Sequence, residues 1–430
     1  MTPPPADTTA VLDRPGGLSP LERLFAQGRL RGSLAMLGPA FVAAIAYVDP
    51  GNFATNVQAG AKYGYMLLWV VLAANLMAML IQYLSAKLGV VTDRNLPELC
   101  RERYPRWASR GLWVQAELMA MSTDIAEFLG AALGLNLLFH VPLFPAGLMT
   151  GAIAFGILAL QRQGFRRFEL AISALLGLIF LGFLYETIKI GPSASASLHG
   201  TFVPHLAGGN SVYLAVGIIG ATVMPHAIYL HSALTQGRTP VRNDSERRRV
   251  LRFERVDVLV ALGFAGVINL TMLAVAAKLF HTPALSSLDT IQQAHHEFGR
   301  LVGGTAALAF AIALLASGAS SSSVGTYAGQ VVMSGFVNLR MPVTVRRAVT
   351  MIPALVVLEA GVSPTSALVL SQVVLSFGIP FALVPLVLLT RNREVMGAYA
   401  NRRLTSAAAI AVTALISGLN VYLLVRQLAP

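Results

Sequence analysis

The first residues able to do chemistry form a polar break inside a long apolar run. Residues 34–61 form one apolar segment, yet its middle holds Asp49-Pro50-Gly51-Asn52. A carboxylate near the centre of a bilayer costs roughly 2.5–3.5 kcal/mol even on the insertion scale, so its presence there points to function. Pro50 removes a backbone N–H and Gly51 admits any backbone angle, so the helix is expected to unwind here.

Unwinding would leave the carbonyl of Ala46 or of Tyr47 without a helical partner. In a dry site a cation can take that partner's place, and Asn52 adds an amide oxygen. The alternative is a proline kink packed against a neighbouring helix. Four successive residues of the type Asp-Pro-Gly-Asn in an apolar run favour the cation site.

A second break lies in the apolar range 211–237, at Met224-Pro225-His226. A thioether favours softer metals such as Mn²⁺, Fe²⁺, Co²⁺ or Cd²⁺ over Ca²⁺ and Mg²⁺, which take oxygen ligands. Most methionines in membrane helices simply pack, but the position of Met224 at a break favours a ligand. Pro225 would free the carbonyl of Ala221. His226 could bind metal, accept protons or line a polar vestibule.

Three carboxylates form a stripe in the range 108–137. Glu117, Asp124 and Glu127 are spaced by seven and three residues, which places them on one helix face. Intramembrane acids on one stripe indicate a proton wire or a buried ion-pair network. The natural partners are Arg346 and Arg347, which could equally be plain cytoplasmic anchors.

Gln372 is an uncharged polar residue deep in the apolar range 364–390. Its amide oxygen could complete a metal shell. Its amide could equally form an interhelical hydrogen bond.

Composition restricts the class of protein. Of the 430 residues, 55% are hydrophobic and 12% are charged, whereas a soluble domain carries about 25% charged residues. The single cysteine, Cys100, excludes an internal disulfide framework and a cysteine metal site. The net charge of +12 comes without a basic face or an aromatic motif for nucleic acid. We find no nucleophile–base pair or nucleotide loop, so an enzyme is not expected.

The apolar pattern predicts about eleven transmembrane helices in one domain, residues 34–427, after a cytoplasmic tail, residues 1–33. The predicted ranges are 34–61, 65–89, 108–137, 143–161, 167–188, 211–237, 254–279, 302–334, 345–361, 364–390 and 403–427.

Charge gives the expected orientation. With the N-terminus in the cytoplasm, the 32 basic residues fall on the inner side except Lys62, Lys189, Lys278, Arg300 and Arg426. This follows the positive-inside rule and places the C-terminus outside. The run 247–249, three arginines, is interpreted as a solvated inner loop.

The odd number of predicted segments indicates two repeats of five helices each and one extra helix. Repeat one would cover about 34–188, repeat two about 211–390, and an extra helix about 403–427. The two proline breaks then fall in corresponding first and sixth segments. Interrupted segments in matching positions of two halves are the best sequence pointer to a transporter binding site.

These motifs resemble those of the Nramp metal transporters. The likeness runs from about Leu37 to Leu424 and rests on Asp49-Pro50-Gly51-Asn52 with Met224-Pro225-His226, and on the stretch 123–127 and Gln372. It implies an all-α membrane fold of the leucine-transporter (LeuT) type, an inverted repeat with helices 1 and 6 unwound. The implied metal ligands are Asp49, Asn52, Met224, the carbonyls of Ala46 and Ala221 and, in some states, Gln372. The implied proton route runs from Asp49 through His226, Asp124 and Glu127 toward Arg346 and Arg347.

The pattern is most similar to bacterial manganese/proton symporters. It implies proton-coupled import of Mn²⁺ first, and of Fe²⁺, Co²⁺ and Cd²⁺, by alternating access. The expected setting is the bacterial inner membrane. Metal and protons are then substrates, no permanent cofactor is expected, and the expected state in the bilayer is a monomer. Relatives that carry magnesium or aluminium differ at the position of Met224.

Two alternatives from other classes remain. A sodium-coupled symporter of organic solutes could use the same fold, but it needs no thioether. An ion channel needs a continuous pore, which discrete breaks and buried carboxylates oppose.

Overall fold

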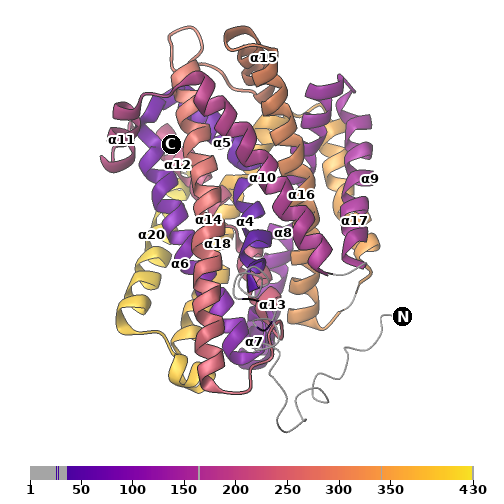
Figure 1. Cartoon of the computed structure of the whole chain (residues 1–430), viewed down its shortest axis with the longest axis vertical. Helices are drawn as coiled ribbons and strands as arrows, with labels where there is room; N and C mark the ends of the chain where they lie inside the picture. Colours follow the sequence, from indigo (N-terminus) through magenta and orange to yellow (C-terminus); the bar gives the residue numbers. More distant parts are fainter. Residues whose placement is uncertain (1–25, 27, 29–35, 163–164, 340, 429–430) are drawn as a thin grey trace.

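The computed structural model describes residues 26, 28, 36–162, 165–339 and 341–428. The predicted tail, residues 1–33, lies outside this part apart from Ala26 and Gly28. Within the described residues every regular element is a helix, and the helices form one upright bundle (Figure 1). The all-α prediction is confirmed.

Helices occupy each predicted apolar range. They are α4 (Pro39–Ile45) with η1 (Ala46–Val48) and α5 (Pro50–Tyr63), α6 (Leu68–Thr92), α8 (Arg106–Phe139), α9 (Leu143–Arg162), α10 (Phe165–Ile190), α12 (Gly209–Thr222) with α13 (Pro225–Thr235), α14 (Asp244–Phe280), α16 (Gly304–Val337), α17 (Val343–Glu359), α18 (Pro364–Arg391) and α20 (Arg403–Leu428).

Shorter helices, which the apolar pattern does not predict, connect the long ones. They are η2 (Gly64–Leu67), α7 (Leu96–Arg103), α11 (Ala194–Phe202), α15 (Ile291–Leu301), α19 (Arg393–Met396) and η3 (Gly397–Tyr399). In Figure 1, α11 and α15 lie at one end of the bundle and α7 lies at the other.

The run 247–249 is not a loop, because α14 already begins at Asp244. Asn243 caps the helix by accepting a hydrogen bond from the backbone N–H of Glu246 at 2.9 Å. Asp244 and Glu246 lie in the first turn, where acidic side chains favour a helix. The interpretation of three successive arginines as a loop missed this cap.

By length and composition, eight helical runs of the described residues could cross a membrane, and two shorter apolar helices accompany them. The count treats α5, η2 and α6 as one run, and α12 with α13 as another. Apolar side chains such as Leu181, Val356 and Val421 remain 59–60% exposed on the bundle, as expected of a surface that faces lipid. The chain is an integral membrane protein.

The centre of the bundle depends on small residues. α8 and α16 pack along one another, and a Cβ added to Gly318 of α16 would lie 2.5 Å from the backbone nitrogen of Ala131 in α8. The missing side chain therefore permits the close approach. This pair of helices carries the carboxylate stripe and the serine-rich segment that contacts the first break.

The start of α4 is fixed by α14. Asp257 accepts hydrogen bonds from the backbone N–H groups of Gly38 at 3.2 Å and Ala40 at 2.9 Å. These are N–H groups that the first turn of a helix leaves without an internal partner. The helix that leads into the first break is therefore held at its beginning.

Candidate metal-binding site

The first break lies at Asp49. η1 ends at Val48, the backbone of Asp49 is extended with ψ 169°, and α5 begins at Pro50. Proline suits the first position of a helix because its missing N–H would have no helical partner there. The Asp49 carboxylate caps α5 by accepting a hydrogen bond from the backbone N–H of Asn52 at 2.8 Å.

The second break lies at Val223 and Met224. α12 ends at Thr222, both residues leave the helical region with ψ 76° and 126°, and α13 begins at Pro225. Because Pro225 has no N–H, the carbonyl of Ala221 loses its helical partner. The side-chain amide of Asn52 donates to that carbonyl at 2.9 Å, which joins the two breaks.

Two side-chain amides donate hydrogen bonds to the acceptors at the breaks. The Nδ2 group of Asn52 also donates to Oδ1 of Asp49 at 2.8 Å, and Nε2 of Gln372 donates to Oδ2 at 3.3 Å. The amide oxygens of Asn52 and Gln372 are buried and have no hydrogen-bond partner among the described residues. The six residues predicted as metal ligands are all completely buried, namely Ala46, Asp49, Asn52, Ala221, Met224 and Gln372.

Gly51 allows Gln372 to reach the first break. A Cβ added to Gly51 would lie 1.8 Å from Nε2 and 2.2 Å from Cδ of Gln372. Such distances are impossible for real atoms, so any side chain at Gly51 would displace Gln372 from Asp49. The structure thus brings α18 into contact with the residue that the sequence singled out for backbone freedom.

Two polar residues that sequence reasoning did not assign to the site complete the first break. Asn269 donates its amide N–H to the carbonyl of Tyr47 at 2.7 Å, and Ser317 donates its hydroxyl to the carbonyl of Val48 at 2.6 Å. The Tyr47 carbonyl, one of the two considered as ligands, is therefore already satisfied. Asn and Ser residues in apolar helices are too common to have identified these contacts.

The carboxylate stripe meets the arginines of α17. Arg346 forms a bidentate contact with Glu117 at 2.7 and 3.2 Å, and NH1 of Arg347 lies 3.6 Å from Oδ1 of Asp124. Arg347 is completely buried and also contacts Ser322 in α16. Asp124 is therefore a buried charge with a partner.

The link from the second break to the stripe passes through Thr123. Nδ1 of His226 lies 3.3 Å from the hydroxyl of Thr123, the residue preceding Asp124. Glu127, one turn further along α8, is fully buried. Nε2 of His226 has no hydrogen-bond partner among the described residues. His231 lies elsewhere, with Nδ1 at 2.8 Å from Oε1 of Gln82 in α6.

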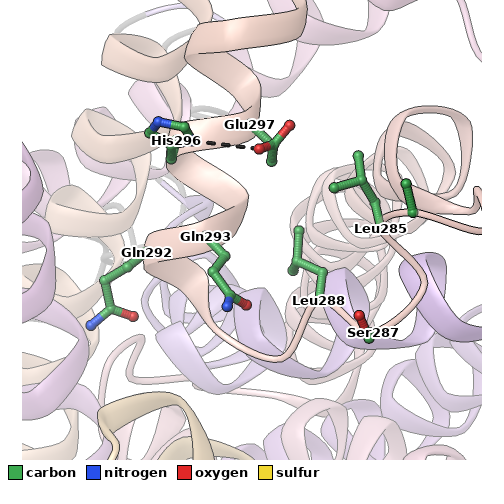
Figure 2. Close-up of a pocket in the computed structure, with 8 residues that line it drawn as sticks. Leu285, Ser287, Leu288, Gln292, Gln293, His296 and Glu297 are labelled. Carbon is green, nitrogen blue, oxygen red and sulfur yellow. Dashed lines mark ion pairs between the residues drawn. The ribbon is translucent and has the colours of Figure 1, made fainter.

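A pocket lies away from these residues. Figure 2 shows a pocket of about 400 Å³ between the segment 284–288 and α15, with His296 paired to Glu297 at 3.4 Å. None of the predicted site residues lines it. In the described part of the chain, no three His, Cys, Asp or Glu side chains are grouped so as to hold a metal. A metal site at the two breaks would therefore hold fewer than three side chains of these types.

Comparison with known proteins identifies close relatives. The model of the Nramp family, described as natural resistance-associated macrophage protein-like, matches residues 40–426. The divalent metal cation transporter MntH of Bacillus subtilis is 52% identical over 395 residues, covering 92% of this chain and 93% of the relative. The protein of the same name from Deinococcus radiodurans is 53% identical over 395 residues, covering 92% and 90%.

Two solved structures resemble the fold. The Eremococcus coleocola manganese transporter, in complex with an aromatic bis-isothiourea substituted compound, is 32% identical with a TM-score of 0.83, covering 91% of this chain and 86% of that one. MHP1, a nucleobase-cation-symport-1 family transporter in a closed conformation, matches with a TM-score of 0.59 at 15% identity, covering 89% and 92%. The second likeness concerns the fold alone.

Proposed function

Because the chain belongs to the Nramp family, we propose that it imports divalent transition-metal ions, Mn²⁺ first, together with protons. The resemblance drawn from the two motifs is confirmed by this membership. The family consists of membrane transporters of metal cations, so the membrane-enzyme alternative is excluded. The relatives' names refer to divalent metal cations and to manganese, which supports this substrate class for the present chain.

The observation that carries the proposal is the donor position of Asn52. Its Nδ2 group lies within 2.9 Å of a carboxylate oxygen and of a carbonyl from the opposite break that has no helical partner. A cation that displaces this N–H group finds both acceptors in place. Rotation of the same amide then turns its unpartnered oxygen, Oδ1, toward the ion.

The remaining proposed ligands explain selectivity. Met224 would offer its thioether, the carbonyl of Ala46 would join, and Gln372 would turn its amide oxygen to the ion in some conformations. A thioether adds little for Ca²⁺ or Mg²⁺ and favours Mn²⁺, Fe²⁺, Co²⁺ and Cd²⁺. Carboxylates bind metals in the deprotonated form, so a proton on Asp49 would have to leave when metal binds.

We propose that protons cross by a path separate from that of the metal. His226 lies beside Thr123, and the neighbouring Asp124 is paired with Arg347. Glu127 and the pair formed by Glu117 and Arg346 extend the polar stripe along α8. Protons leaving Asp49 would travel along this stripe while the metal leaves between the two breaks.

The proposed architecture is a five-plus-five inverted repeat with one extra helix, eleven spans in total. The breaks are its unwound first and sixth helices. This is supported by packing, because α4 contacts α13 on one side of the breaks and α5 contacts α12 on the other. Movement of one pair relative to the other would open the site to alternate sides. We place the N-terminus in the cytoplasm, the C-terminus outside, and a monomer in the bacterial inner membrane.

Uptake of labelled Mn²⁺ into proteoliposomes tests the proposal. Asp49→Ala and Met224→Ala should each abolish or strongly reduce uptake, whereas Met396→Ala, a buried methionine in α19, should leave it near wild type. Labelled amino acids should not enter, whereas a symporter of organic solutes would take them up. Wild-type uptake in both Asp49→Ala and Met224→Ala would refute the site. Dependence of uptake on an inward pH gradient tests the coupling.

A further inference from the structure

An apolar groove of about 590 Å³ opens on the side of the bundle between α8 and α18. Its walls include Tyr104, Trp107 and Gly111 near the start of α8, and Phe381, Val384 and Leu388 of α18. Trp107 is 79% exposed and Leu388 is 49% exposed. None of these residues belongs to the metal site or to the carboxylate stripe, so the groove requires its own explanation.

The groove has a direction along the helix axis. Phe381, Val384 and Leu388 are spaced by three and four residues, so they form one strip on α18. Arg391, three residues further on, continues that strip at the end of the helix. On the facing wall, Arg106 precedes Trp107 at the first turn of α8. The apolar trench therefore ends among cationic side chains.

These cations are available to a ligand. Arg106, Arg110 and Arg391 are exposed and form no ion pair among the described residues, whereas nearby Arg103 lies 3.7 Å from Glu394. Guanidinium groups are well suited to phosphate because they donate two parallel hydrogen bonds. Tyr104 and Trp107 stand beside them, and such aromatic side chains are characteristic of the headgroup level of a membrane.

We infer that this groove is a binding site for an anionic phospholipid. One acyl chain lies along the strip from Phe381 to Leu388, and the phosphate lies between Arg106 and Arg391. In an integral membrane protein such a surface faces lipid, and its charge selects which lipid. Each basic residue near a membrane surface favours anionic lipid by roughly fivefold, so two residues give a preference of roughly 25-fold at most, on the order of tenfold, over a zwitterionic lipid.

The three tryptophans of the chain make the test direct, because Trp107 lines the groove. In the double variant Trp69→Phe/Trp113→Phe, fluorescence reports Trp107 alone. The protein is placed in vesicles of unbrominated phosphatidylcholine. Increasing fractions of one brominated lipid are then added, either phosphatidylglycerol or phosphatidylcholine, each brominated on its acyl chains. We expect half-maximal quenching at a roughly tenfold lower fraction of brominated phosphatidylglycerol. Coincident quenching curves for the two lipids would overturn the proposal.

The headgroup contact is tested in the same background. Adding Arg106→Gln and Arg391→Gln should remove the preference, so that both brominated lipids quench Trp107 at the same fraction. Retention of a tenfold preference in this variant would place the phosphate elsewhere and refute the site.

Gly111 permits a steric test with a matched control. A Cβ added to Gly111 would meet no protein atom within 4 Å, so Gly111→Leu fills the groove without a collision. Gly177 in α10 is also exposed, and a Cβ added to it would likewise meet no protein atom within 4 Å, so Gly177→Leu is the control. Gly111→Leu should lower the maximal quenching by phosphatidylglycerol at least twofold, and Gly177→Leu should leave it unchanged. Equal quenching in both variants would show that the lipid does not occupy the groove.

Discussion

Replacing Asn52 by Asp is the sharpest test of the donor position at the breaks. Asn52→Asp keeps the shape of the side chain but exchanges an N–H donor for a second carboxylate oxygen. That oxygen would lie at the present distance of Nδ2, 2.8 Å from Oδ1 of Asp49 and 2.9 Å from the carbonyl of Ala221. Three acceptors would then face one another without a donor, unless a proton or a cation enters.

The magnitude follows from the distance. Two carboxylate charges 2.8 Å apart repel by about 6 kcal/mol at an effective dielectric constant of 20. This is comparable to the entire stability of many domains, about 5–15 kcal/mol. The pair will therefore hold a proton in the absence of metal, or the local structure will open. A bound divalent cation removes the repulsion, so the variant should depend on Mn²⁺ more strongly than the wild type.

Thermal unfolding in detergent measures this dependence. At pH 8 without metal, Asn52→Asp should melt below the wild type, and saturating Mn²⁺ should raise its melting temperature by more than it raises that of the wild type. At pH 6 the shared proton competes with the metal, so the Mn²⁺ effect should shrink. Asn52→Leu, of the same shape but without donor or acceptor, is the control and should gain nothing from Mn²⁺. A smaller Mn²⁺ effect in Asn52→Asp than in the wild type at both pH values would refute the reasoning.

Three further predictions concern the surroundings of the site. Gly51→Ala should cost about 1–3 kcal/mol of stability by overpacking, and adding Gln372→Ala should restore most of it, measured by thermal unfolding. Arg347→Gln should cost about 3–5 kcal/mol because it leaves Asp124 buried without its partner, and the double variant with Asp124→Asn should be more stable than the single one. Met224→Ile, of similar volume, should weaken Mn²⁺ binding and reduce its preference over Ca²⁺, measured by competition for binding in detergent.

The helical ranges could be predicted well from the sequence because long apolar runs are a strong signal of membrane helices. It did not predict α7, α11 or α15, since these connecting helices are short and carry polar residues on exposed turns. The start of α14 at Asp244 was missed for a related reason, because a cap outweighed the charge of the arginines that follow.

At the two breaks, the residues that interrupt the helices could be predicted from the sequence, but the atomic contacts between them could not. Asp49 and Pro225 can be recognised in the sequence because a carboxylate and a proline are unusual in the middle of an apolar run. That Asn52 spans the two breaks with its N–H group depends on the packing of α5 against α12, which no local pattern encodes. The same holds for Asn269 and Ser317, which reach the first break from distant helices.

Which arginine pairs with which carboxylate of the stripe could be learned only from the structure. Arg346 and Arg347 are consecutive, yet they contact Glu117 and Asp124, two turns apart on α8. Successive residues of a helix point about 100° apart, so neighbours on α17 can reach positions far apart along a helix they cross. The sequence suggested the partners and left their assignment open.

A single acid at the breaks would suit the proposed site, which has to release its ion. Asp49 would offset one of the two charges of the metal, while amide, carbonyl and thioether groups contribute dipoles without charge. The loaded site would then keep a net positive charge, and the membrane potential would favour inward movement by about 2.3 kcal/mol per charge per 100 mV. A second carboxylate would bind the ion more tightly, since ligand charge raises affinity, and would cancel this driving force. Asn52→Asp should therefore bind Mn²⁺ more tightly than the wild type at pH 8 and yet transport it more slowly in proteoliposomes.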